Sequence, residues 1–333
     1  MSPSGVAHRA SPRLAELYAP IRSDLAVAAR VFDEEVFSEL SFVNGLCETV
    51  RSYRGKMLRP ALLLLCGRAT GCVTAAHHTL AAVVEMVHMA TLAHDDVLDD
   101  ASTRRRNVTV NALAGNTSAV LLGDYLISHA FHLCSSLDSQ YASRLIGATT
   151  NTVCEGELLQ NHSRGRFDLS ESAYFDIIGR KTAALTATCC ALGGRYADGD
   201  ADVVDALASY GRSVGIAFQI VDDVLDVVGD GGEVGKTLGR DMDLGKLTLP
   251  TIHCLRAGDD AVKTRLLQAL SDPAVRRNGA LRAWLTETGS LSYARCTAER
   301  YVADAVARLD VLAPSDAKAS LTAMAEFIVL RRY

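Results

Sequence analysis

The sequence has little proline, almost no strand-like pattern and no concentration of basic residues. Only seven prolines occur among 333 residues, whereas alanine and leucine, which favour helices, recur throughout. Long helices joined by short turns are expected, so the fold class is predicted to be all-α. The net charge of −5 at pH 7 comes without a basic tail. Because nucleic-acid binding requires a clustered Lys/Arg surface, we expect no nucleic-acid partner.

Signals for export, membrane insertion or a thiolate metal site are also missing. The nine cysteines lack the paired spacing of metal ligands and suit a reducing cytoplasm, where we expect the protein. The most apolar stretch, 80–93, is interrupted by Glu85 and His88 and is too short for a transmembrane segment. Residues 1–11 lack a signal-peptide core and are expected to be disordered. No linker composition appears, so residues 1–333 are predicted to form a single domain.

Hydrophobic periodicity predicts a chain of helices with one long polar interruption. The last helix should break near Pro314. The stretch 229–246 is rich in glycine, aspartate and lysine and is expected to be a mobile loop. The predicted helices span 12–37, 39–53, 58–70, 74–101, 109–138, 141–164, 170–195, 200–229, 247–257, 260–270, 273–288 and 290–330.

Two aspartate-rich segments, HDDVLDD and FQIVDDVLD, each follow an apolar helical run. A spacing of four residues places the outer carboxylates of each motif on one helix face. One copy alone is also typical of a solvated acidic helix end, but two copies indicate a shared function. The carboxylates concerned are Asp95, Asp96, Asp99, Asp222, Asp223 and Asp226.

If both helix ends face one cavity, these carboxylates repel one another. Each close pair costs about 4 kcal/mol at a separation of about 4 Å and an effective dielectric near 20. Bound cations would relieve the repulsion, and an oxygen-only ligand set favours Mg²⁺ that retains waters and bridges to diphosphate oxygens. We therefore predict that all six aspartates bind metal and serve catalysis.

Basic residues flank the first motif and suggest an anion site. Lys56 and Arg59 precede Pro60, and a run of arginines begins at Arg104. Arginine grips phosphate oxygens with two hydrogen bonds and lysine adds a mobile charge, although the same residues are ordinary on a surface. His88 lies seven residues before the first aspartate, on nearly the same helix face, as either a core histidine or an anion ligand.

In the order of these motifs the chain resembles the trans-isoprenyl diphosphate synthases, in particular long-chain polyprenyl synthases such as octaprenyl diphosphate synthase. The likeness covers residues 15–330. It rests on Gly55, Lys56, Arg59 and Pro60 and on HDDVLDD, GNTSAVLLGDYL, EGELLQ, GRKTAAL, FQIVDDVLD and GKLTLP. The family usually has glycine and lysine where this chain has Arg106 and Asn107, which leaves the loop conformation there open.

The resemblance implies an isoprenoid synthase-type helical bundle around a deep central cavity, three Mg²⁺ ions per active site and a homodimer. Residues 109–138 are a candidate dimer surface, although an interior helix would look the same. Lys181 is expected to be catalytic as well as substrate-binding. The residues implied to bind isopentenyl diphosphate are Lys56, Arg59, His88 and Arg105. Those implied around the allylic diphosphate are Arg104, Lys181, Thr182, Gln219, Lys236 and Lys246.

The implied reaction condenses an allylic diphosphate with successive isopentenyl diphosphates. In the family, bulky residues just before the first motif stop chain growth early, whereas here Ala90 and Thr91 stand there. Phe131 and His132 are candidates for a deeper floor, and by family analogy the product should have about thirty to fifty carbons. Alternatives are a shorter-chain farnesyl or geranylgeranyl diphosphate synthase, a terpene cyclase, or a non-catalytic subunit of a heteromeric synthase.

Overall fold

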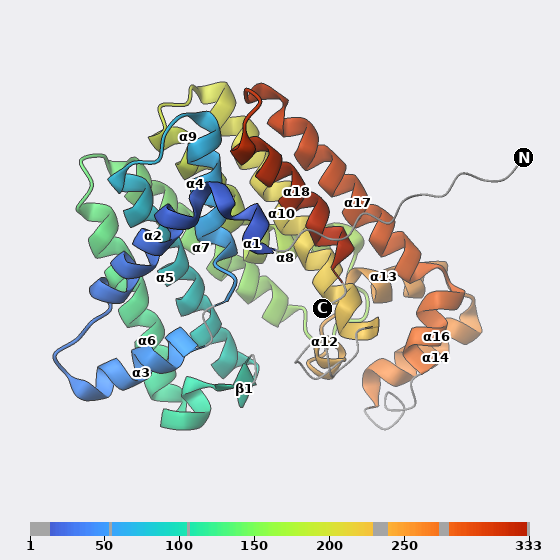
Figure 1. Ribbon diagram of the computed structural model, residues 1–333. Coiled ribbons are helices and arrows are strands. Elements are labelled where there is room, and N and C mark those ends of the chain that lie inside the picture. The colour runs from blue at the N-terminus through green and yellow to red at the C-terminus, as the bar shows by residue number, and fades with distance from the viewer. Residues whose placement is uncertain (1–13, 53–54, 105–106, 229–238, 273–279, 332–333) are drawn as a thin grey trace, which may run out of the picture.

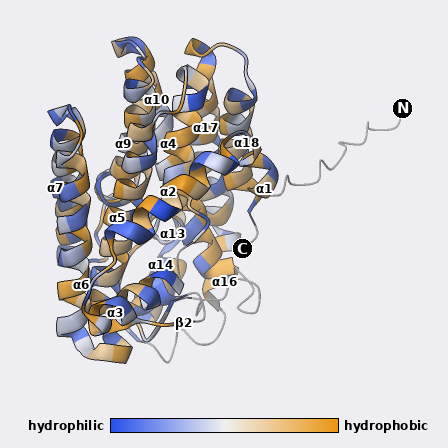
Figure 2. Ribbon diagram, turned by 60° about the vertical axis from the view of Figure 1, so that its left-hand side comes forward, coloured by the Kyte–Doolittle hydropathy of each residue, from blue (hydrophilic) through white to orange (hydrophobic). Residues whose placement is uncertain are grey.

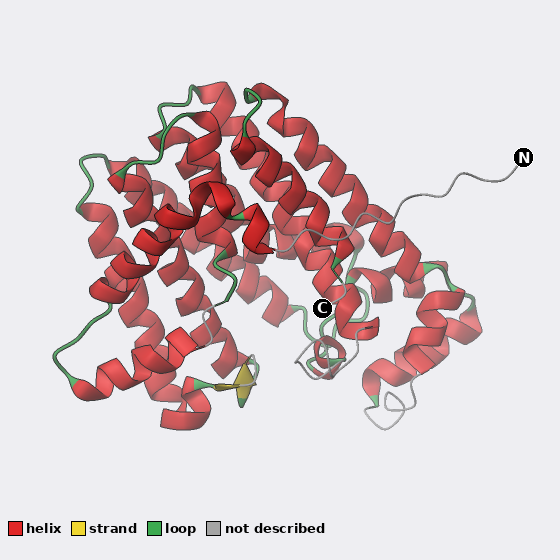
Figure 3. Ribbon diagram, viewed as in Figure 1, coloured by secondary structure: helices red, strands yellow, loops and turns green. Residues whose placement is uncertain are grey.

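The computed structural model describes residues 14–52, 55–104, 107–228, 239–272 and 280–331, and these are almost entirely helical (Figure 1, Figure 3). The N-terminal half contains α1 Leu14–Leu17, η1 Ala19–Ile21, α2 Arg22–Glu35, α3 Ser41–Ser52, α4 Leu58–Thr70, α5 Ala75–Leu98, β1 Thr103–Arg104, β2 Asn107–Val108, α6 Val110–Ser135 and α7 Gln140–His162. The remainder contains α8 Glu171–Ile178, η2 Gly179–Ala183, α9 Ala184–Tyr196, α10 Ala201–Val228, α12 Arg240–Asp243, α13 Leu249–Ala257, α14 Asp260–Ser271, α16 Ala280–Glu287, α17 Ser290–Arg308, η3 Leu309–Val311 and α18 Asp316–Leu330.

The predicted all-α class is confirmed, with three local differences. The predicted helix 12–37 is wrong as a single element, because Pro20 stands in a 3-10 turn between α1 and α2. Residues 103–104 and 107–108 form a short antiparallel hairpin that the sequence did not predict. The stretch expected to be wholly loop includes the four-residue helix α12. The break near Pro314 is confirmed, since α17 ends at Arg308 and α18 begins at Asp316.

Helix α5 lies at the centre of the bundle and packs against α2, α4, α6 and α9. Its residues from Leu80 to Val87 are buried on every side, which includes the carboxyl of Glu85. Helix α4 is similarly buried along most of its length, whereas α2 lies nearer the surface with hydrophobic and hydrophilic residues side by side (Figure 2). The apolar run 80–93 is therefore a core helix, as its length predicts. None of the described helices combines the length and hydrophobicity needed to cross a bilayer.

Helices α5 and α10 carry the two aspartate motifs at their C-terminal ends. Helix α7 connects them, because it packs against both α5 and η2, and η2 packs against α10. Gly156 permits this approach, since a β-carbon there would lie 2.5 Å from the backbone nitrogen of Lys181. The segment η2 is a single π turn, a distortion that often occurs at functional sites. It places Lys181 and Thr182 next to α7 and α10.

Candidate active site

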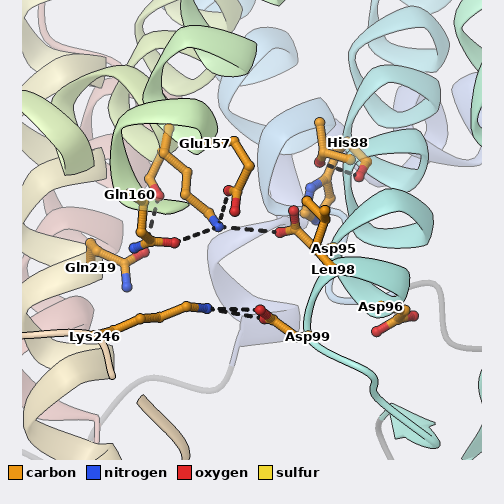
Figure 4. Close-up of polar contacts among 12 residues, drawn as sticks. His88, Asp95, Asp96, Leu98, Asp99, Glu157, Gln160, Gln219 and Lys246 are labelled. Atoms are coloured by element: carbon orange, nitrogen blue, oxygen red, sulfur yellow. Dashed lines mark hydrogen bonds and ion pairs between the residues drawn. The ribbon is translucent and has the colours of Figure 1, made fainter. Parts of the chain in front are cut away.

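Lys181 links the first aspartate motif to α7. Its ammonium lies 3.6 Å from Asp95 Oδ2, donates to Gln160 Oε1 at 2.9 Å and forms an ion pair with Glu157 (Figure 4). Burial lowers the pKa of Lys181, but the charges of Asp95 and Glu157 outweigh it and raise that pKa. The ammonium is therefore held charged beside the motif, in the position to bind an anion.

Asp99, the C-cap of α5, is surrounded by cations from distant parts of the chain. Lys246 donates to both of its carboxylate oxygens at 3.1 Å (Figure 4). Arg164 donates to Oδ1 at 2.6 Å. Burial would raise the pKa of Asp99, but Lys246, Lys181 and Arg164 lower it. This carboxylate is accordingly ionised over the whole neutral range.

Asp96, the middle residue of the first motif, points into the protein. It is 1% exposed, and Arg104 binds its Oδ1 through Nε at 2.9 Å and Nη2 at 2.8 Å. Burial raises its pKa, and Arg104 opposes that rise. Its other oxygen is buried and accepts no hydrogen bond from the part of the chain that the structure describes. Asp96 is therefore paired with the arginine of β1, and its role as a metal ligand stays a prediction.

Asp223, the middle residue of the second motif, is held by neutral groups. It is 3% exposed, Tyr174 donates to Oδ2 at 2.6 Å, and Gln219 donates to Oδ1 at 2.9 Å. Gln219 accepts in turn from the Thr182 hydroxyl at 3.0 Å. Burial and the nearby Asp241 raise the pKa of Asp223 well above its usual value, although the two hydrogen bonds oppose this. The carboxyl of Asp223 is thus held by two neutral donors and lies near a second carboxyl, that of Asp241.

The segment after Gly239 joins the two motifs directly. The Gly239 N–H binds the carbonyl of Asp226 at 2.9 Å, and the Asp241 N–H donates to Asp226 Oδ2 at 3.2 Å. Between them, Arg240 donates to the backbone carbonyl of Asp99 at 3.0 Å. One short segment therefore contacts the ends of α5 and α10 together, and the two motifs lie at a common site, as the sequence predicts.

Asp222 of α10 contacts the segment that follows α18. Arg331 Nη2 lies 3.4 Å from Asp222 Oδ1, and its guanidinium stacks over the Phe218 ring at 4.4 Å. The Arg331 side chain is 14% exposed, so the residue after α18 is packed beside the second motif. Nothing in the sequence motifs pointed to it.

A cavity of about 40 Å³ lies between α7, α8, α10 and α12. The polar residues that line it include Gln160, Tyr174, Gln219, Asp223 and Lys246. Sites for organic ligands of moderate size have about 300–1,000 Å³. This cavity is smaller than such a site.

The upstream basic residues Lys56 and Arg59 lie at the start of α4. Lys56 is exposed, and its backbone carbonyl accepts from the Tyr18 hydroxyl at 2.8 Å. Arg59 lies in the first turn of α4. Burial raises the pKa of the Cys189 thiol, the positive charge of Arg59 lowers that pKa, and the negative charge of Glu85 raises it. Arg59 and Glu85 therefore both lie near Cys189, where α4, α5 and α9 meet. On α5, Glu85 precedes His88 by about one helical turn.

The candidate chain-length residues occupy different environments. Ala90 is fully buried, and Thr91 is partly buried with its hydroxyl donating to the His88 carbonyl at 2.7 Å. Phe131 lies at the contact of α6 with α7, where its ring is 3.7 Å from the β-carbon position of Gly147. His132 is 72% exposed and paired with Glu35 of α2, so the structure does not support it as part of a channel floor.

Comparison with known proteins identifies the family. The profile of the polyprenyl synthetase family matches residues 41–284. The chain belongs to the polyprenyl synthetase family. It is 34% identical over 310 residues to an octaprenyl diphosphate synthase of Escherichia coli (strain K12), which covers 92% of this chain and 96% of that protein.

Two further similarities extend this result. A short chain isoprenyl diphosphate synthase of Methanothermobacter thermautotrophicus is 34% identical over 283 residues, covering 84% of this chain and 87% of that protein. The crystal structure of a polyprenyl synthase from Caulobacter crescentus CB15, complexed with calcium and isoprenyl diphosphate, superimposes with a TM-score of 0.91. The sequence identity is 31%, with 98% of this chain and 100% of that chain covered. This polyprenyl synthetase is a prenyltransferase of isoprenoid biosynthesis, a trans-prenyl diphosphate synthase.

The donor set of this polyprenyl synthetase fits a hard divalent cation. Asp95 and Asp99 share one helix face with Glu157 nearby, and all three supply oxygens. Burial raises the pKa of Asp95 and the charge of Lys181 opposes it, while Glu157 and Asp99 raise it further. That crowding of carboxylates is what a bound Mg²⁺ would relieve. Asp222 and Asp226 offer similar oxygens across the site.

Several residues of the site were missed or lie outside the described residues. Glu157 and Gln160 of the motif EGELLQ were not predicted as site residues, although their spacing of three places them on one face of α7. Arg164 follows the end of that helix. Tyr174, Arg240, Asp241 and Arg331 had no comparable signal, because only the fold brings them to the aspartates. The predicted residues Arg105 and Lys236 lie outside the described residues.

Proposed function

We propose that this polyprenyl synthetase condenses an allylic diphosphate with successive isopentenyl diphosphates into a long all-trans polyprenyl diphosphate. The observation that carries the proposal is the joining of the two aspartate motifs by residues 239–241, with Lys181 and Lys246 directed at Asp95 and Asp99. Two carboxylate clusters and two lysines at one site suit a metal-bound diphosphate on its way to becoming a leaving group.

Ionisation of the allylic substrate breaks its C–O bond, and pyrophosphate leaves with the electron pair. Mg²⁺ ions, three by family analogy, would supply positive charge to the departing pyrophosphate when bound. Asp95, Asp99, Asp222 and Asp226 would hold them. The polyprenyl synthase of Caulobacter crescentus was crystallised in complex with calcium and isoprenyl diphosphate, which supports the use of a divalent ion.

The residues of the chain perform the remaining tasks. Lys181 and Lys246 neutralise pyrophosphate oxygens, Thr182 and Gln219 orient them through their mutual hydrogen bond, and Asp96 fixes Arg104 beside them. Asp223 keeps the second motif anchored to Tyr174. Lys236 is proposed to join the allylic diphosphate site, and Lys56, Arg59, His88 and Arg105 to hold isopentenyl diphosphate.

Held close to the allyl cation, the double bond of isopentenyl diphosphate attacks it and a C–C bond forms. The product loses a proton to the released pyrophosphate, so no side-chain nucleophile is needed. The buried helix walls exclude water, which would convert the cation to an alcohol.

The proposed length of the product is about thirty to fifty carbons, by family analogy. Identity alone leaves length open, because the octaprenyl and short-chain relatives are both 34% identical to this chain. The proposal rests on the absence of a bulky residue at Ala90 and Thr91. Phe131, at the contact of α6 with α7, is proposed to limit the tail at greater depth.

The deciding experiment incubates purified protein with farnesyl diphosphate, labelled isopentenyl diphosphate and Mg²⁺, and sizes the labelled product. We expect several additions per chain. A product with a single addition would favour the shorter-chain alternative, and a hydrocarbon without label would indicate a terpene cyclase. Absence of any turnover by the chain alone, with turnover on adding a partner subunit, would indicate a heteromeric synthase.

A second experiment tests the chain-length residues. Thr91→Phe should shorten the product sharply if the tail passes this residue, whereas Thr91→Val, which removes the hydroxyl without adding bulk, should leave the length unchanged. Ala90→Phe is a less selective test, because Ala90 is fully buried and a larger side chain there also disturbs packing. An unaltered product from Thr91→Phe would place the limit elsewhere.

The assembly and location are also proposals. A homodimer through α6 is supported by the exposed apolar side chains of Leu113, Val120 and Leu121, which are 61%, 40% and 61% exposed. A cytoplasmic location is supported by nine cysteines that are all free thiols. One continuous core from Leu17 to Ile328 supports a single domain.

A further inference from the structure

Two histidines and a glutamate meet on the side of the bundle where α2 and α6 end. Glu35 is the last residue of α2, and His129 and His132 are three residues apart on α6, so both imidazoles lie on one helix face. The Nδ1 atoms of His129 and His132 lie 2.9 and 2.8 Å from the same oxygen, Glu35 Oε1. This group takes no part in the proposed prenyl transfer.

The three ligand atoms have the spacing of an incomplete metal site. One atom from each residue lies within 4.8 Å of the other two, and within the described ranges no other group of three histidine, cysteine or carboxylate side chains does so. In a tetrahedral zinc site with bonds of about 2.0–2.1 Å, ligand atoms are separated by about 3.3 Å. The two N···O distances need to lengthen by only about half an ångström to reach that value.

The surroundings favour a cation and leave room for a further ligand. Helix C-terminal ends carry partial negative charge, and Glu35 closes α2 while His132 lies in the last turn of α6. The Glu35 and His129 side chains are 16% and 25% exposed, whereas that of His132 is 72% exposed. The site therefore has a packed side and an open side where water completes the coordination.

We propose that Glu35, His129 and His132 form a binding site for a divalent transition metal, with Zn²⁺ as the expected ion. Two imidazoles and one carboxylate suit Zn²⁺, while Mg²⁺ and Ca²⁺ prefer oxygen-only sets such as that of the aspartate motifs. Binding needs each imidazole neutral with its proton on Nε2, so that Nδ1 offers a lone pair. Such an ion would fasten the end of α2 to α6.

The test measures metal binding rather than prenyl transfer, so it does not depend on the proposed function. Protein stripped with a chelator is titrated with Co²⁺ in excess Mg²⁺, which occupies the oxygen-only sites. The visible absorption of the bound Co²⁺ reports its geometry, and an additional strong band in the near ultraviolet would reveal coordination by one of the nine thiols. Zn²⁺ is then added to displace Co²⁺, and the melting temperature is recorded.

We expect one equivalent of Co²⁺ without the thiolate band, its displacement by Zn²⁺, and a higher melting temperature with Zn²⁺. His132→Gln should abolish all three effects, and because its side chain is largely exposed the variant should fold normally. Glu35→Gln and His129→Gln should act in the same way.

Two matched controls, Glu34→Gln on the exposed side of α2 and His162→Gln at the exposed end of α7, should behave like the wild type. Retention of the Co²⁺ spectrum and of the Zn²⁺-dependent melting shift in His132→Gln would overturn the proposal. A spectrum dominated by thiolate coordination would overturn it equally.

Discussion

The two aspartate motifs have the same spacing, but their middle residues lie in different surroundings. In the first, each aspartate has a cationic partner drawn from another element: Lys181 for Asp95, Arg104 for Asp96, and Lys246 with Arg164 for Asp99. In the second, Asp223 is held by the neutral Tyr174 and Gln219.

The middle residues show the difference most clearly. Asp96 and Asp223 are both buried, yet an arginine opposes the rise in the pKa of Asp96, whereas the carboxylate of Asp241 adds to the rise in the pKa of Asp223. The first motif is thus built with its own counter-charges. At Asp223 a neighbouring carboxylate adds to the effect of burial, so a bound cation should matter more there.

The largest expected effect comes from removing one outer carboxylate of either motif. Asp95→Ala and Asp222→Ala should each lower turnover by orders of magnitude, because each removes a proposed metal ligand on one side of the proposed diphosphate site. Steady-state rates with excess Mg²⁺ test this, with helix content checked by circular dichroism. Near-normal rates in either variant would contradict a site that needs both motifs, and a chelator should abolish wild-type activity.

The cations beside the two motifs should differ in importance. Lys246→Ala should lower kcat/KM for the allylic diphosphate by about 10- to 100-fold, since a charge-assisted contact is lost. Arg331→Ala should lower it only about two- to fivefold, because the Arg331 to Asp222 pair is longer, at 3.4 Å. Arg265→Ala, on the exposed surface of α14, is the control. Equal losses of kcat/KM in Lys246→Ala and Arg331→Ala would contradict the expected difference between the two motifs.

Substitution of the two middle aspartates should affect the stability of the protein to different extents. Asp96→Asn should lower the free energy of unfolding by about 1–3 kcal/mol, because Arg104 loses its charged partner. Asp223→Asn should change it by less than about 1 kcal/mol, since the lost hydrogen bond is offset by removal of a buried charge near Asp241. Urea unfolding of both variants without metal gives the comparison. A larger loss for Asp223→Asn would show that its carboxylate is not under electrostatic stress.

The smallest effect is a difference in pH dependence. The lowered pKa of Asp99 gives a contribution to stability that is present above its unfolded value of about 3.9 and is lost as pH falls through the folded value. The raised pKa of Asp223 gives a contribution that is present below about 3.9 and is lost as pH rises through the folded value.

Melting temperatures measured without metal from acid to neutral pH test both signs. In Asp99→Asn the melting temperature should fall less than in the wild type as the pH is lowered into the acid range. In Asp223→Asn it should fall less than in the wild type as the pH is raised towards neutral. Parallel curves for both variants and the wild type would mean that neither carboxylate has a different pKa in the folded and unfolded states.

Prediction from sequence succeeded where local pattern carries the information. The helical periods located α5 and α10, and the spacing of Asp95 and Asp99 placed both on one face. It failed at Pro20, where a 3-10 turn interrupts the predicted first helix. It also missed the paired strands 103–104 and 107–108, which are too short to show a strand period. It could not separate Asp96 from its neighbours, because only the position of Arg104 makes that carboxylate an internal partner.

By itself the sequence determined the helical class, the two acidic helix ends and the supply of basic residues, because these depend on periodicity and on residue type. The tertiary structure alone decided which charges meet. Arg331 reaches Asp222 across 109 residues, Lys246 reaches Asp99 across 147, and Glu35 receives two histidines from a helix more than 90 residues away. Contacts at such separations depend on how whole helices pack, and the local pattern around each residue contains no record of that packing.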